Sequence, residues 1–159
     1  MHSHQLTAGR TFGIRFDPGE SFFPALEEFC AVNGIRGGYI PMFIAAFADA
    51  DIVGACDKLE DPAAPVWSKV HLTNAEALGC GTIAWDGRAG RILPHVHTTL
   101  GLKERSATGY TSHLLAAIVQ FLIEMIVVEV TAPAMTRYAD PALYDVPRLV
   151  FGAGPEHTV

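Results

Sequence analysis

Hydrophobic and polar residues alternate with a period of two along much of this chain, the pattern of β-strands that bury one face. The run from Phe12 to Phe16 is an early example, and it ends at an Asp-Pro-Gly turn signal. Further strand-like runs follow at residues 35–53, from Val66, at 77–85 and, after the hairpin signal Asp86-Gly87, around His95 and His97. Successive strands joined by short turns favour a largely antiparallel sheet.

One segment has helical spacing instead. Ser21 is placed to cap its start, and Gly34 can supply the left-handed residue that ends a helix. We therefore predict an amphipathic helix over residues 21–33, whose apolar residues recur mostly at intervals of three and four: Phe22, Leu26, Phe29, Cys30 and Val32.

The most hydrophobic stretch, residues 114–130, resembles a membrane span in its composition. Two glutamates and a glutamine interrupt it, and a spanning helix tolerates carboxylates poorly. Its second half, residues 123–130, is rich in β-branched residues and predicts a central strand. For residues 114–119, a short helix and a continuation of that strand both fit.

These elements predict a single domain of the α/β (α+β) class, with a mainly antiparallel sheet flanked by one or two helices. A chain of 159 residues is the size of one ordinary domain. We expect the domain to span residues 10–151, between a flexible N-terminal tail at 1–9 and a C-terminal tail at 152–159. A polar loop at 57–65, which contains prolines, is expected to be mobile.

Charge and composition narrow the choice of partners. The formal net charge is −6, and the eleven basic residues are scattered, so the electrostatic footprint of nucleic-acid binding is missing. Half of the residues are hydrophobic and only 18% are charged. This excess of apolar residues predicts self-association.

The N-terminal residues and the cysteines both bear on the cellular location of the protein. The N-terminal residues lack the positive start and apolar core of a signal peptide. Cys30, Cys56 and Cys80 are odd in number and form no CxxC pair, so they indicate buried thiols in a reducing compartment, with ligation of a metal as an alternative. We therefore expect a cytoplasmic protein without a membrane segment.

Three histidines form the strongest chemical signal. His95 and His97 are two residues apart, so on a strand both imidazoles point to one face, and His113 in the next segment can complete the set. Three neutral nitrogen ligands with an open fourth position are typical of a catalytic-type site for zinc, although imidazole also serves other divalent transition metals. The alternative is that these histidines are structural.

The order of several short motifs resembles the plant- and prokaryote-conserved (PPC) domain family. The motifs are the helix after Asp17-Pro18-Gly19-Glu20, then Leu78 to Ala84 followed by Asp86-Gly87, then His95-Val96-His97, Gly109 to Leu114, and finally Glu129 with Arg137 and Asp140. The resemblance covers roughly residues 10–150. It implies an α/β domain with a mainly antiparallel sheet, a homotrimer, and a metal, often zinc, bound by His95, His97 and His113.

This chain departs from the family pattern at three places. Thr111-Ser112 precede His113 where the family usually has two glycines, which predicts a change in the local backbone path. The bulky tract 41–47 replaces a segment that tends to contain glycine, and it could narrow a nearby site. The chain contains no Arg-Gly-Arg-Pro AT-hook, on which the DNA-related role of plant members depends.

The fold and its three histidines are also similar to acetolactate decarboxylase, a zinc enzyme in which the metal stabilises an enolate. An enzyme of this kind needs a general acid or base and a group that holds an anion. The candidates in this sequence are Glu76, Glu129, Arg105, Arg137 and Tyr110. For each of them a surface or sheet-edge role is the alternative.

Three hypotheses follow. The favoured one is a trimeric, metal-binding PPC-type protein whose site, apolar with a few polar groups, suits a small carboxylate or keto acid. The second is a metal-dependent lyase, of the decarboxylase kind, or a hydrolase. The third is a DNA-associated or protein-interaction module with structural histidines, which the acidic balance of charge disfavours.

Overall fold

The computed structural model describes residues 2–54 and 68–152 of the chain. Within these residues it has seven strands, one α-helix and a short 3-10 helix, in the order β1 (Thr7–Phe16), α1 (Phe22–Asn33), β2 (Gly38–Val53), β3 (Lys69–Asp86), β4 (Arg91–Leu102), β5 (Arg105–Ala132), β6 (Met135–Asp140), the 3-10 helix (Pro141–Leu143) and β7 (Val146–Phe151). The predicted α+β class is confirmed. The predicted loop at 57–65 and residues 153–159 of the C-terminal tail lie outside the described residues.

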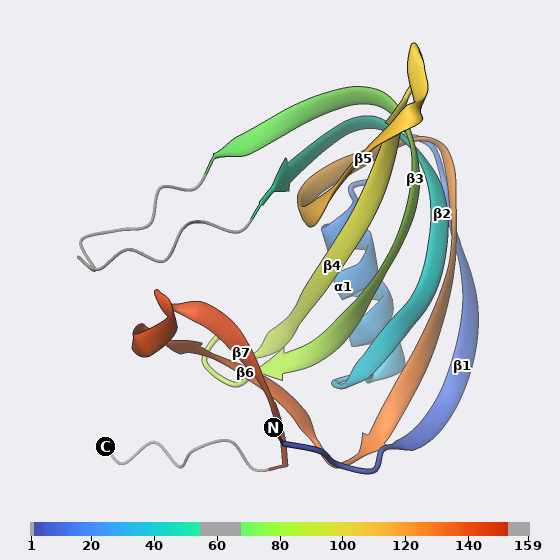
Figure 1. Ribbon diagram of the computed structural model, residues 1–159. Helices are drawn as coiled ribbons and strands as arrows, with labels where there is room; N and C mark the ends of the chain where they lie inside the picture. Colours follow the sequence, from blue (N-terminus) through green and yellow to red (C-terminus); the bar gives the residue numbers. More distant parts are fainter. Residues whose placement is uncertain (1, 55–67, 153–159) are drawn as a thin grey trace.

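The strands form one strongly curved sheet (Figure 1). Its order is β1-β5-β2-β3-β6-β7, and β4 pairs with both β3 and β5. Because β5 also pairs with β2, strands β2, β3, β4 and β5 close into a ring. Among the described strands, the parallel pairing is between β3 and β6 and the others are antiparallel, so the predicted mainly antiparallel sheet is confirmed.

Helix α1 packs on the sheet through one face, from which Phe22, Leu26 and Cys30 are fully buried. Gly34 ends it with φ 67°, and its N–H donates to the carbonyl of Ala31, as the sequence predicted. Ser21 occupies the N-cap position but its side chain makes no capping hydrogen bond. Its backbone instead forms an isolated β-bridge with Ile118, which ties the start of the helix to β5.

The structure decides between the two alternatives for residues 114–119: they belong to β5, which pairs with β2 along this stretch. One prediction about the long strands needs correction. The two strands predicted from Val66 and at 77–85 are one strand, β3, which begins at Lys69. Within it, Asn74 has φ 52°, a conformation that asparagine tolerates.

The ends of the domain also differ from the expected bounds. β1 starts at Thr7, so strand pairing begins inside the segment 1–9 that we expected to be a tail. At the other end, β6 and β7 form an antiparallel hairpin that the hydrophobic pattern did not indicate. This hairpin pairs with β3 at Trp85 and Asp86, and its Met135 packs against Ala84 and Val130.

The core is built around three phenylalanines, Phe22, Phe43 and Phe47, all fully buried. The ring centroids of Phe22 and Phe43 lie 5.3 Å apart, a separation at which aromatic pairs attract. Phe43 crosses β3 at Gly79, where an added Cβ would lie 2.2 Å from its ring. The bulky tract 41–47 thus directs its two aromatic rings into the core, and it does not narrow the site described below.

The burial of the cysteines and the search for a membrane-spanning helix test two more predictions. Cys30 is buried as expected, Cys80 is exposed, contrary to expectation, and Cys56 lies outside the described residues. Cys80 is exposed because it lies on the solvent-facing side of β3, opposite His97. In the described part of the chain, no helix is long and apolar enough to cross a membrane.

Candidate metal centre

Strand register brings the three histidines together. His97 of β4 lies directly opposite His113 of β5, and His95 is two residues away from His97 on the same face. The ring centroid of His95 is 5.0 Å from that of His97 and 4.8 Å from that of His113. The Thr111-Ser112 pair keeps a regular register opposite Thr99 and Thr98.

The imidazole nitrogens converge in a way that fits a metal. One ligand nitrogen from each of the three histidines lies within 4.8 Å of the others, and Nε2 of His95 and His97 are 3.0 Å apart. Nitrogens bound tetrahedrally to zinc at their usual distance are roughly 3.3 Å apart. His95, His97 and His113 would therefore hold the ion after small side-chain adjustments.

The protonation of the histidines favours ligation. His95 and His113 are partly buried, whereas His97 is exposed. Burial, followed by the positive charge of Arg137, lowers the pKa of His95 to about 4. Burial, the neighbouring His97 and Arg137 lower the pKa of His113 in the same direction. Both rings are neutral at pH 7, which is the form that binds metals.

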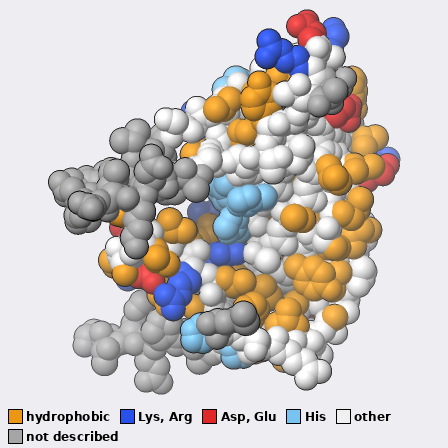
Figure 2. All heavy atoms as spheres, in the orientation of Figure 1, with side chains coloured by type: hydrophobic (Ala, Val, Ile, Leu, Met, Phe, Trp, Pro, Cys, Tyr) orange, Lys and Arg blue, Asp and Glu red, His pale blue; other side chains and the backbone are white. Residues whose placement is uncertain are grey.

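The histidines face a cavity of about 660 Å³. Figure 2 shows their side chains gathered in a hollow of the molecular face, with hydrophobic and basic side chains around them. Most of the wall is apolar, and it comes from strands that are distant in sequence: Val53, Leu93, Pro94, Leu115, Val146 and Pro147. The charged side chains of the described lining, apart from the histidines, are Arg137 and Lys69.

Arg137 is the one member of the predicted acid, base and anion-holding set that lines this cavity. It is only 5% exposed, and it donates hydrogen bonds from Nε to the carbonyl of Leu93 (3.2 Å), from Nη1 to the carbonyl of Pro147 (3.1 Å) and from Nη2 to Thr82 Oγ1 (2.5 Å). Burial lowers the pKa of Arg137, but a guanidinium stays protonated at neutral pH.

The charge of Arg137 has no carboxylate partner among the described residues. Its three hydrogen bonds go to neutral oxygens and use one N–H from each nitrogen, so two of its five N–H groups have no hydrogen-bond partner among the described residues. A buried cation without a counter-ion is costly. An anion in the cavity would remove this cost.

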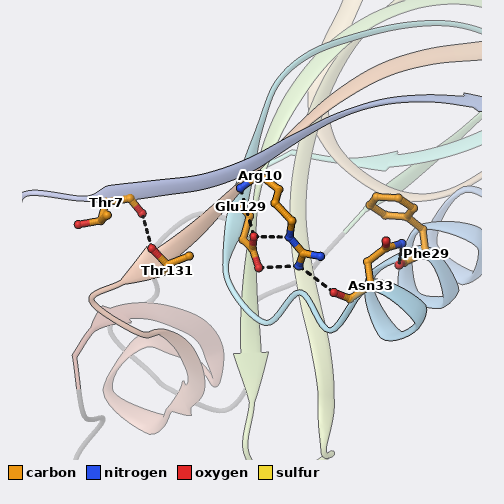
Figure 3. A network of polar contacts seen from close by, with 6 residues as sticks. All are labelled: Thr7, Arg10, Phe29, Asn33, Glu129 and Thr131. Atoms are coloured by element: carbon orange, nitrogen blue, oxygen red, sulfur yellow. Dashed lines mark hydrogen bonds and ion pairs between the residues drawn. The ribbon is translucent and has the colours of Figure 1, made fainter.

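Glu129 lies elsewhere and has a different partner (Figure 3). Its two carboxylate oxygens accept hydrogen bonds at 2.8 Å from Nε and Nη2 of Arg10, and Nη2 of Arg10 also donates to the carbonyl of Asn33. The hydrogen bond from Arg10 lowers the pKa of Glu129 to about 2. This network connects β1, β5 and the end of α1, and Glu129 does not line the cavity.

The remaining candidates are also outside the described lining of the cavity. Glu76 is exposed on β3 opposite Gly101, and Tyr110 packs at the edge of the hydrophobic core. Arg105 lies at the start of β5, opposite Leu102. Sequence reasoning did not single out Thr82, which orients Arg137 and lies opposite His95 in the register. Thr82 lies within the motif Leu78 to Ala84, but only the pairing of β3 with β4 shows that it is next to the histidines.

Solved structures share this fold at low sequence identity. A PPC protein from Pyrococcus horikoshii has 21% identity and a TM-score of 0.76, with 93% of this chain and 97% of that chain covered. A metal-containing protein from Archaeoglobus fulgidus has 22% identity and a TM-score of 0.75, with 96% and 100% covered. Acetolactate decarboxylase from Bacillus subtilis subspecies spizizenii is more distant, with 16% identity, a TM-score of 0.48 and 79% and 54% covered.

No curated protein matches this sequence. Residues 3–131, in contrast, match the domain described as Plants and Prokaryotes Conserved (PCC), which is the PPC family that the motifs resemble. That range includes β1 to β5 and all three histidines, whereas Arg137 follows it on β6. The chain therefore belongs to the Plants and Prokaryotes Conserved domain family.

Proposed function

We propose that His95, His97 and His113 bind one divalent transition metal ion, with zinc as the first choice, and that the ion and Arg137 together bind a small carboxylate or keto acid. The observation that carries this proposal is the convergence of three imidazole nitrogens within 4.8 Å beside a buried guanidinium that no described carboxylate neutralises. The Archaeoglobus fulgidus protein with the same fold is a metal-containing protein, which supports the proposal of a metal site.

Electrostatics favours an anionic ligand. A metal ion held by three neutral imidazoles keeps its full charge, and Arg137 adds a second positive charge close enough to lower the pKa of two of the ligands. The described lining contains no aspartate or glutamate to balance these charges. A carboxylate would offset part of this positive charge, and Arg137 would bind it in the bidentate manner that guanidinium allows.

Turnover is the alternative to binding. The bound metal would act as a Lewis acid on a carbonyl oxygen of the ligand. A lyase or decarboxylase also needs a proton donor within hydrogen-bonding reach, and the described lining offers no Asp, Glu or Tyr. The hydroxyl of Ser112 lines the cavity, but it donates to the carbonyl of Val53. We therefore favour a binding role over catalysis, and the net charge of −6 gives no support to a DNA-associated role.

Metal analysis of the purified, untagged protein tests the proposal. We expect about one equivalent of transition metal per chain, and loss of at least nine-tenths of it in His97→Ala. His71→Ala is the matched control, because His71 is an exposed histidine on the neighbouring strand β3 that contacts Asp49 and Asp51. Retention of full metal content by folded His97→Ala would overturn the assignment.

Self-association is a further part of the proposed function. The exposed face of the sheet carries apolar side chains next to the site, including Ile44 (42% exposed) and Leu78 (58% exposed), which lie opposite each other on β2 and β3. Leu78 and Cys80 are on the same face of β3, and Cys80 is opposite His97. A homotrimer would cover this apolar face, and the exposed thiol of Cys80 agrees with a reducing, cytoplasmic location.

A further inference from the structure

The cavity is much larger, and more apolar, than a three-carbon acid requires. We infer that its ligand is an amphipathic monocarboxylate, a 2-oxo or 2-hydroxy acid with an apolar body of roughly six or more carbons. This inference rests on the proposed function, since it takes the metal and Arg137 as the polar end of the site. It adds the chemistry of the rest of the ligand.

The first step is size. A cavity of about 660 Å³ lies in the middle of the range, roughly 300–1,000 Å³, in which proteins bind ligands of drug size. A keto acid of three or four carbons would contact the histidines and Arg137 and leave most of the apolar wall in contact with water. A longer body would remove that wall from water, which is the favourable change.

The second step is the distribution of polar groups. Arg137 and His95 are neighbours, because Thr82 accepts a hydrogen bond from Arg137 and lies directly opposite His95. One end of a ligand can therefore contact both the guanidinium and the metal position. Most of the remaining described wall is formed by aliphatic and proline side chains from β2, β4, β5 and β7, namely Val53, Leu93, Pro94, Leu115, Val146 and Pro147.

The third step is the number of charges. The other cation of the lining is Lys69, and its Nζ is 2.8 Å from Oδ2 of Asp51, so its charge already has a partner. A second carboxylate on the ligand would lie against the apolar wall, and its desolvation would be uncompensated. The site therefore selects one carboxylate and an apolar remainder.

Titration calorimetry on the full-length, metal-loaded protein tests this selectivity with three acids: pyruvate, 2-oxooctanoate and 2-oxoglutarate. Each buried methylene strengthens binding about fourfold at most. We expect 2-oxooctanoate to bind at least tenfold more tightly than pyruvate, and 2-oxoglutarate to bind no more tightly than pyruvate. Octan-1-ol, which lacks the carboxylate, should bind at least tenfold more weakly than 2-oxooctanoate.

A pair of variants locates the apolar contact. Leu115→Ser should weaken binding of 2-oxooctanoate at least threefold and leave pyruvate unchanged, because Leu115 lines the cavity. Leu122→Ser is the matched control on the same strand: Leu122 is 38% exposed, Leu115 is 42% exposed, and Leu122 does not line the cavity. We expect the control to bind both acids as the unmodified protein does.

The outcomes separate this inference from the proposed function. If pyruvate binds as tightly as 2-oxooctanoate, or if 2-oxoglutarate binds most tightly, the amphipathic ligand is wrong while the metal and carboxylate site stands. Equal loss of 2-oxooctanoate binding in both leucine variants would also overturn the inference. If the protein holds no metal, or if no acid binds to the loaded protein, the proposed function fails and the inference fails with it.

Discussion

At the scale of single residues, burial leaves two histidines of the site neutral but leaves the arginine charged. Burial lowers the pKa values of His95 and His113, so these imidazoles are neutral at pH 7 and can bind a cation. Burial also lowers the pKa of Arg137, yet the guanidinium keeps its proton and its charge. The same cavity thus offers neutral donors for a metal ion and a fixed positive charge for an anion.

Glu129 provides a prediction at this scale. Its pKa is lowered from 4.5 to about 2, so the ion pair with Arg10 stabilises the fold above pH 4.5, and this contribution is lost as the pH falls toward 2. Glu129→Gln should therefore lower the free energy of unfolding at pH 7 and have little effect at pH 2. Urea unfolding of both proteins at the two pH values measures this.

The control for that prediction is Glu28→Gln, an exposed glutamate on α1. It should leave the free energy of unfolding unchanged at both pH values. A deficit of Glu129→Gln that is equal at pH 7 and pH 2 would contradict the assigned ion pair.

At the scale of elements, the hairpin β6–β7 is attached to the sheet by the packing of Met135 against Ala84 and Val130 and by hydrogen bonds of Arg137. Beyond the short parallel pairing at Trp85 and Asp86, the Arg137 side chain joins β6 to β3, β4 and β7 through three hydrogen bonds. The hairpin also supplies Val146 and Pro147 to the cavity wall. One residue therefore both helps to hold the wall in position and lines the cavity.

Arg137→Met should loosen this hairpin selectively. It removes the three hydrogen bonds that Arg137 donates to the oxygens of Thr82, Leu93 and Pro147. Amide hydrogen exchange should accelerate in β6 and β7 at least tenfold more than in β1, which is distant in the sheet order. Uniform acceleration across both elements would contradict the anchoring role.

At the scale of the whole molecule, the features that could be predicted from the sequence are those that depend on the local pattern of residues. The helix with Gly34 at its end, the antiparallel sheet and the pairing of His95 with His97 on one face follow from spacing over a few residues. Long-range pairing was not predictable in this way. Arg10 and Glu129 are 119 residues apart, and the sequence pattern contains no signal that joins Arg137 to Thr82.

Assembly gives the prediction at this largest scale. Leu78→Lys places a charge in the exposed apolar face beside Ile44, and burying that charge between subunits would be costly. We expect the unmodified protein to have the mass of a trimer at micromolar concentration and Leu78→Lys to have that of a monomer, measured by light scattering. Val32→Lys, at an apolar residue of α1 that is 79% exposed, should keep the trimer mass.

The most direct test of the central claim is the visible spectrum of the protein loaded with Co²⁺, recorded with and without pyruvate. Three imidazoles and one exchangeable ligand should give the intense bands of four-coordinate Co²⁺, and pyruvate should shift them. Arg137→Lys should require at least tenfold more pyruvate for the same shift, since lysine lacks the bidentate geometry. Weak bands typical of hydrated Co²⁺, or strong bands that pyruvate does not change, would contradict a metal centre that binds carboxylates.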